Sequence, residues 1–117
     1  INRFKKLKNK KKFSIQGTGN EIRSFIHIED FIDGFDKIFK KGKNREIYNI
    51  GTSEKLKISQ LAIIIGKIFN KKVKLIKTKI FKGSASKRCP NIIKIKKLGF
   101  KQKISLKDGL KQIILND

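Results

Sequence analysis

Two arginines stand out in this 117-residue chain, because only four of its 31 basic residues are arginine. A guanidinium group matches the oxygens of a phosphate or carboxylate in a bidentate way that a lysine cannot. Arg23 follows a glycine-containing segment, and Arg88 lies just before a predicted helix N-terminus at residues 90–91. A helix N-terminus also attracts anions. Arg23 and Arg88 are therefore candidate anion-binding groups, with surface salt bridges as the alternative.

The other reactive side chains are few and isolated. The single histidine, His27, lies in an apolar segment, and the single cysteine, Cys89, precedes a proline and cannot form an internal disulfide. Neither lies at a spacing typical of a nucleophile and its base, and together they are too few for a structural zinc site. Glu29 and Asp30 form a carboxylate pair that helix capping explains. We therefore expect no catalytic residue and no metal site in this chain.

The charge of the chain favours a second class of function. The formal net charge is +22, and residues 5–12 form a basic run, so a nucleic-acid-binding module is an alternative interpretation. Lysine and isoleucine are abundant whereas alanine and proline are scarce, which is typical of AT-rich coding and indicates that much of the charge is background. No helix-turn-helix, zinc or RNA-recognition pattern is present, and aromatic residues do not interleave with the basic run. We expect no specific nucleic-acid partner.

Length and apolar content fit a single domain in a reducing compartment. The longest apolar run, residues 61–65, is far shorter than the roughly 20 residues that a membrane helix needs. No signal peptide is visible, and a lone cysteine favours a cytoplasmic location. We expect a cytoplasmic protein with no membrane partner.

The predicted elements alternate between strands and helices, which indicates an α/β fold. Strands are predicted at 13–16, 25–28, 46–50 and 73–76, and helices at 30–41, 59–69, 91–98 and 105–114. Asp30 and Ser59 are the expected N-caps of the first two helices, and Ser105 with Asp108 forms a variant capping box. Gly42 is expected to end the first helix.

Gly17 and Gly19 are expected to form a turn between two strands, with freedom to adopt positive φ. A dinucleotide fingerprint would need a helix after the turn and a third glycine three positions on, where this chain has Ile22. We therefore expect no cofactor-binding residue here.

Four blocks of sequence occur in order along the chain. They are Gly17-x-Gly19-x-x-x-Arg23-x-Phe25-Ile26-His27-Ile28-x-Asp30, Tyr48-Asn49-Ile50-Gly51, Arg88-Cys89-Pro90-Asn91-Ile92 and Leu98-Gly99-Phe100-Lys101-Gln102-Lys103-Ile104-Ser105-Leu106-Lys107-Asp108-Gly109-Leu110. Their order and spacing resemble those of the NAD-dependent sugar-nucleotide epimerases and dehydratases, which are extended short-chain dehydrogenases/reductases. The resemblance extends over nearly the whole chain, from about residue 1 to residue 114.

The resemblance implies that residues 1–117 are the C-terminal, substrate-binding part of such an enzyme. In that case the strand at 46–50 and the helix starting at Asp30 belong to a Rossmann-type domain, and the rest forms a substrate lobe. The family's NAD fingerprint and its Tyr-x-x-x-Lys pair are absent, so NAD(P) would be bound by an N-terminal half missing from this chain. The chain would be inactive by itself, and the full enzyme would be a homodimer.

The resemblance also implies a ligand. Arg23 and Arg88 would clamp the diphosphate and ribose of a nucleoside-diphosphate sugar. Several positions depart from the family pattern: Gln16, Glu21, Asn91 and Gln102. A non-catalytic remnant of the enzyme is a further alternative. If the strand at 46–50 normally sits in a larger sheet, the isolated chain exposes an unpaired edge and an apolar helix face, and we expect it to be marginally stable or to associate.

Overall fold

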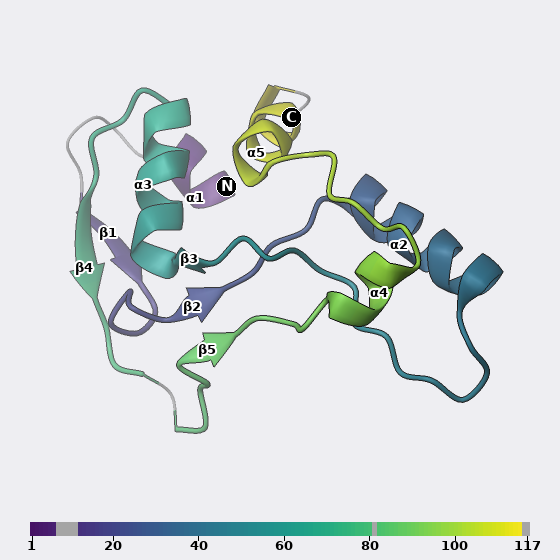
Figure 1. Cartoon of the computed structure of the whole chain (residues 1–117). Coiled ribbons are helices and arrows are strands. Elements are labelled where there is room, and N and C mark those ends of the chain that lie inside the picture. Colours follow the sequence, from purple (N-terminus) through teal and green to yellow (C-terminus); the bar gives the residue numbers. More distant parts are fainter. Residues whose placement is uncertain (7–11, 81, 116–117) are drawn as a thin grey trace.

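The computed structural model describes residues 1–6, 12–80 and 82–115 (Figure 1). The helices are α1 (Asn2–Lys5), α2 (Ile28–Lys41), α3 (Ile58–Ile68), α4 (Ile93–Lys97) and α5 (Leu106–Leu115). The strands are β1 (Lys12–Ile15), β2 (Ile22–Arg23), β3 (Leu56–Lys57), β4 (Lys74–Lys77) and β5 (Lys87–Arg88). Most of the basic run predicted at 5–12 falls on residues 7–11, outside the described residues. The described helices include none that is long and apolar enough to cross a membrane.

The strands form two small sheets. β1 and β4 pair in parallel, with Ile15 opposite Lys77. In the second sheet β2 is central, antiparallel to β3 and parallel to β5. Figure 1 shows the first sheet beside α1 and α3, while the chain continues from the second sheet toward α2 and α4.

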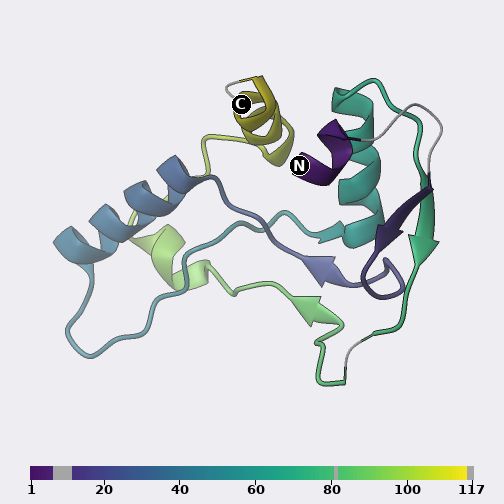
Figure 2. The same ribbon diagram turned by 180° about the vertical axis from the view of Figure 1, so that it is seen from behind.

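The molecule is flat and extended. Its Cα extents are 51 × 35 × 16 Å and its radius of gyration is 16.7 Å, whereas a compact chain of this length has about 13 Å. Its accessible surface is 8797 Å², against about 6500 Å² for a compact monomer of this mass. Figure 2 shows, from behind, α2 and α4 at one end and α3, β1 and β4 at the other, joined by extended segments. The described chain thus leaves an unusually large surface uncovered.

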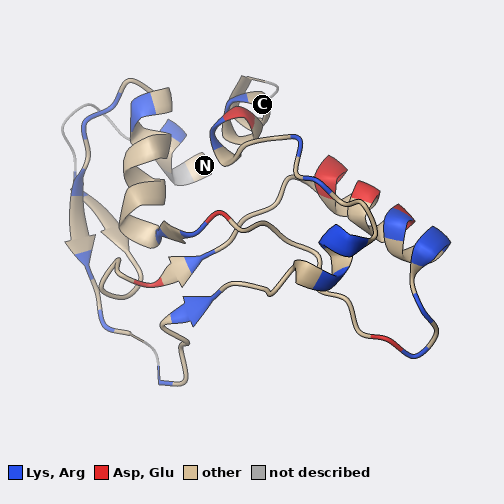
Figure 3. Ribbon diagram, viewed as in Figure 1, with Lys and Arg blue, Asp and Glu red and all other residues tan. Residues whose placement is uncertain are grey.

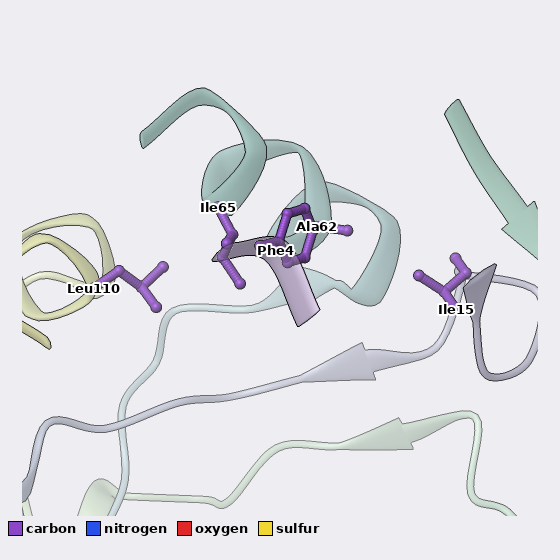
Figure 4. Close-up of a cluster of buried hydrophobic side chains, with 5 residues drawn as sticks. All are labelled: Phe4, Ile15, Ala62, Ile65 and Leu110. Atoms are coloured by element: carbon purple, nitrogen blue, oxygen red, sulfur yellow. The ribbon is translucent and has the colours of Figure 1, made fainter. Parts of the chain in front are cut away.

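The buried side chains form two separate clusters. The first gathers residues from α1, β1, α3 and α5 (Figure 4): Phe4, Ile15, Ala62, Ile65 and Leu110. The second consists of Ile92, Ile95 and Phe100, with Ile26, Ile38 and Ile50 packed against it. The second cluster attaches α2 to α4, so each end of the molecule has a core of its own.

Helix α2 differs from the prediction at its start and agrees with it at its end. It begins at Ile28, so the predicted strand at 25–28 is wrong and β2 lies earlier in the chain. A short apolar run has no periodicity that separates a strand from a helix start. The N-cap is His27, whose Nδ1 accepts the backbone N–H of Glu29 at 3.4 Å, and not Asp30 as predicted. Gly42 is the C-cap, as expected.

The predicted strand at 46–50 is also wrong. This segment forms no strand, because none of the described strands lies beside it to complete a ladder. Its residues are held instead by single contacts: Tyr48 Oη accepts the backbone N–H of Lys43, and Ile50 packs on the second cluster. Ile47 is left 81% exposed.

The remaining helix starts follow local hydrogen bonds. α3 begins one residue before the predicted cap Ser59, and Gln60 Oε1 accepts the backbone N–H of Lys57 at 3.0 Å. α4 is shorter than the predicted 91–98. The capping pair of α5 is confirmed: Ser105 Oγ accepts the backbone N–H of Asp108 at 3.2 Å and donates to its carboxylate at 2.6 Å.

Candidate functional site

The structure places the two predicted anion-binding arginines side by side. β2 and β5 pair in parallel, and in their register Arg23 lies directly opposite Arg88. Residues paired across neighbouring strands lie about 4.8 Å apart and point to the same face of the sheet. Two guanidinium groups that are 65 positions apart in sequence therefore share one face of the second sheet.

The two arginines differ in how they are held. Arg23 is half-buried, and its guanidinium donates to the carbonyls of Ile22 at 2.8 Å and Ala85 at 3.0 Å. A guanidinium carries five N–H donors, so these contacts leave donors over for a ligand. Arg88 is exposed, and none of the described residues accepts a hydrogen bond from its guanidinium. Arg23 is thus held by two carbonyl groups, whereas Arg88 is an exposed neighbour on the same face.

A pocket of about 360 Å³ opens at Arg23. Its walls come from β1, the turn after it, β2, α3 and the segment between β4 and β5: Phe13, Ser14, Ile15, Gln16, Gly17, Glu21, Arg23, Ile58, Ile80 and Ser84. Arg88 is not part of this wall and stands on the adjoining strand. The structure therefore brings only one of the two predicted residues into the pocket itself.

The glycine turn in the pocket wall is held by a carboxylate. Gly17 and Gly19 have φ of 82° and 81°, which confirms the predicted turn. Glu21, which is buried, accepts hydrogen bonds from the backbone N–H of Thr18 at 2.9 Å, from its hydroxyl at 3.0 Å, and from the backbone N–H of Gly19 at 2.8 Å. The backbone N–H groups of Thr18 and of Glu21 itself, followed by the other two donors, lower the pKa of this carboxyl against the opposing effect of burial. Glu21 therefore holds the turn as an anion.

Sequence reasoning missed this role of Glu21, because it treated the residue only as a departure from a family pattern. The signal was available in the spacing. A carboxylate two residues after a Gly-x-Gly turn is well placed to accept its N–H groups, as a helix cap does. A Cβ on Gly17 would lie 2.5 Å from Glu21 Oε1, so the glycine is needed for this contact.

The other candidate groups have structural surroundings. His27 caps α2, and its ring lies against Gly109 of α5. Cys89 is half-buried, and Asp30 is buried between α2 and the segment before α5. Within residues 1–6, 12–80 and 82–115, no three histidine, cysteine or acidic side chains are grouped so that they could hold a metal ion. The turn after β1 leads into β2 and not into a helix, so these residues do not fit a dinucleotide.

Comparison with known proteins now adds to this geometry. Residues 1–51 match the model of the NAD dependent epimerase/dehydratase family. Human dTDP-D-glucose 4,6-dehydratase is 30% identical over 115 residues, which covers 92% of this chain and 33% of that enzyme. The chain therefore matches one part of the length of NAD-dependent epimerases and dehydratases. This finding confirms the resemblance seen in the four sequence blocks.

Solved structures of this family share the fold. UDP-glucose 4-epimerase from Thermotoga maritima, solved with UDP-glucose, is 29% identical with a TM-score of 0.78, over 86% of this chain and 32% of that one. UDP-glucuronic acid 4-epimerase from Bacillus cereus, solved with UDP-glucuronic acid and NAD, is 29% identical with a TM-score of 0.77, over 86% of this chain and 33% of that one. The chain spans about a third of the length of these relatives, in agreement with the expected C-terminal part of an α/β enzyme.

Proposed function

We propose that this chain is the nucleotide-sugar-binding part of an NAD-dependent epimerase or dehydratase. In this proposal Arg23 and Arg88 clamp the diphosphate of a nucleoside-diphosphate sugar. The observation that carries it is their register, which places two guanidinium groups on one face beside a pocket. Charge-assisted, bidentate contacts of this kind are the strongest hydrogen bonds available to a phosphate.

The clamp acts by orientation. Binding energy from the part of a substrate that does not react holds the reacting part in place. Among the described residues, the glycine turn after β1 does not lead into a helix as a dinucleotide site requires, so we assign the cofactor to a part of the protein outside residues 1–117. The sugar hydroxyl that the family's chemistry acts on would then meet that cofactor only when the two parts are joined.

An exposed apolar surface on α2 supports a contact with that other part. Five apolar side chains at helical spacing form an exposed stripe, with these exposed fractions: Ile28 63%, Phe31 42%, Ile32 58%, Phe35 61% and Phe39 82%. The adjoining face of the same helix, with Gly34 and Ile38, packs on the second core cluster. A helix that is apolar on both of these faces is typical of burial on both sides. We propose that the cofactor-binding part covers this α2 stripe.

The test of the clamp is a binding measurement with UDP on the 117-residue chain. Arg23→Ala and Arg88→Ala should each weaken binding by roughly 1.5–3 kcal/mol, the range for a hydrogen bond to a charged group. For UMP, which lacks the second phosphate, the same substitutions should cause a smaller loss of binding free energy. Lys41→Ala, which removes a cation at the end of α2, is the matched control and should leave the affinity unchanged. If both arginine variants bind UDP as tightly as the unaltered chain does, and their circular dichroism is unchanged, the clamp is refuted.

A further inference from the structure

The charge of this molecule is distributed unevenly. No aspartate or glutamate occurs between residues 55 and 107, although that stretch holds 17 basic residues. Four of the nine acidic residues of the chain lie instead on α2: Glu29, Asp30, Asp33 and Asp36. Figure 3 shows red along the first turns of α2, and blue on β5 and β4 as well as on α4 and the last turns of α2. The first turns of α2 are therefore acidic, whereas β4 and β5 carry basic charges alone.

One group of lysines gathers in the segment that runs from the end of β4 to β5. Its members, which we call the lysine rim, are Lys77, Lys79, Lys82 and Lys87, and all four are exposed. The ion pairs among the described residues lie elsewhere: Lys40 with Asp36, Lys94 with Glu46, and Lys103 with Asp33. The charge of the rim is thus not neutralised by any acidic residue that the structure describes.

The rim borders the pocket. Lys77 lies opposite Ile15 in the first sheet, and Lys87 lies opposite Ile22, next to Arg23. Thr78, between two rim lysines, donates its backbone N–H to the carbonyl of Gly17 at 3.1 Å and its hydroxyl to the carbonyl of Ile15 at 3.0 Å. These two bonds hold the segment against the glycine turn.

Glu21 is the one acidic residue among the described residues of the pocket wall, and its carboxylate already accepts the donors of Thr18 and Gly19. The exposed ammonium groups of the rim therefore border a pocket whose wall contains Arg23. Lys87 directly precedes Arg88 on β5 and so projects from the opposite face of that strand, and its charge acts on an approaching anion through space. Ammonium groups on flexible stems act as point charges without fixed geometry, whereas guanidinium groups give directed contacts.

We infer that the lysine rim steers a nucleoside diphosphate into the pocket, so that it sets the rate of association while the arginines set the rate of dissociation. This inference rests on the proposed function and adds four residues to it. Positive charges gathered around a pocket raise the rate at which anions associate with it by roughly 10- to 1000-fold at low ionic strength. Charges outside direct contact alter association more than dissociation, and salt screens them.

The test is stopped-flow binding of a fluorescent UDP analogue to the full chain. The variant with all four rim lysines changed to glutamine should bind about tenfold more slowly at about 20 mM salt, with dissociation changed by less than about twofold. This difference in association rate should vanish at about 500 mM salt, where the Debye screening length falls to about 4 Å. In the matched control, Lys37, Lys41, Lys97 and Lys101 are changed to glutamine. This control also removes four positive charges, but at positions distant from the pocket, and its association rate should stay within about twofold of that of the unaltered chain.

Each other outcome has a distinct meaning. An unchanged association rate in the rim variant, together with faster dissociation in Arg23→Ala, overturns steering and leaves the clamp standing. Faster dissociation in the rim variant shows that the lysines hold the ligand and also overturns steering. If the unaltered chain does not bind the UDP analogue, both proposals fail. Binding of a single-stranded oligonucleotide at about 150 mM salt that depends on the rim and not on the arginines would identify a polyanion surface instead and overturn the inference.

Discussion

The carboxylate of Asp30 in α2 accepts the backbone N–H of Lys103, 73 residues later in the chain, at 3.0 Å. Its second oxygen accepts the backbone N–H of Ile104, also at 3.0 Å. Asp30 is only 1% exposed, and the Lys103 side chain pairs with Asp33 one turn further along α2. These contacts fasten the segment before α5 to α2 and therefore connect the two ends of the molecule.

Replacement of Asp30 should loosen that connection. Asp30→Ala leaves two partly buried N–H groups without an acceptor and should lower the free energy of unfolding by about 1–3 kcal/mol, and Asp30→Asn, which keeps one acceptor, by about 1 kcal/mol. Urea unfolding followed by circular dichroism measures both. The control is Asp36→Asn on the same helix, whose ion pair with Lys40 is exposed and is worth at most about 0.5 kcal/mol. Equal losses at Asp30 and Asp36 would contradict the role assigned to the Asp30 carboxylate.

Features of this fold that depend on near neighbours in the chain can be predicted from the sequence, whereas those that depend on distant residues cannot. The end of α2 at Gly42, the positive φ of Gly17 and the Ser105–Asp108 cap depend on neighbours within a few residues, and the sequence predicts all three correctly. The role of Asp30 depends on a partner 73 residues away, so local reasoning takes it for a cap.

The candidate site shows the same limit. Composition and motif spacing identify Arg23 and Arg88 as special, but the sheet register that pairs them is a tertiary property that no local pattern contains. The strand predicted at 46–50 fails for a related reason. A strand is defined by its partner, and the described chain holds none for this segment.

The turn beside the pocket should depend on pH through Glu21. Its pKa is lower in the folded chain than the ordinary glutamate value, because N–H groups of the turn donate to its ionised form. Ionised Glu21 therefore stabilises the folded state above the unfolded pKa, and this contribution is lost as the pH falls through the lowered, folded value. Glu21→Gln should destabilise the chain at pH 7 and do so less and less toward acid pH.

Unfolding in urea at a series of pH values measures this effect, with the exposed Glu29→Gln as the control for removal of a carboxylate. A difference between Glu21→Gln and the unaltered chain that stays constant from pH 7 down to acid pH would refute the assignment.

Gly34 tests how closely α2 packs on the second core cluster. Alanine normally stabilises a helix interior over glycine by about 1 kcal/mol. A Cβ at Gly34, however, would lie 2.8 Å from Ile50 Cγ2 and 3.2 Å from Ile95 Cδ1. Gly34→Ala should therefore lower the free energy of unfolding by about 1–3 kcal/mol, the usual cost of overpacking. The change should be milder in an Ile50→Leu background, which lacks the γ-methyl group, and an equal cost in both backgrounds would argue against this contact.

The exposed stripe on α2 should make the isolated chain associate. Contiguous apolar surface of this kind is rare on monomeric proteins, so the chain should sediment faster with increasing concentration and bind hydrophobic dyes. Phe35→Gln with Phe39→Gln should reduce both effects and change the free energy of unfolding by less than about 0.5 kcal/mol, because both side chains lie mostly in solvent. Sedimentation velocity together with thermal unfolding measures these properties.

The control for the stripe is Ile95→Ala, which removes a fully buried side chain of the second cluster and should cost about 2–5 kcal/mol without any reduction of dye binding. If the unaltered chain is instead a monomer that unfolds cooperatively above about 60 °C, it is more stable than most mesophilic domains and the α2 stripe needs no partner. That result would contradict the covering part inferred for α2, while the contacts of Arg23 and Arg88 with a diphosphate would remain to be judged by their own binding measurement.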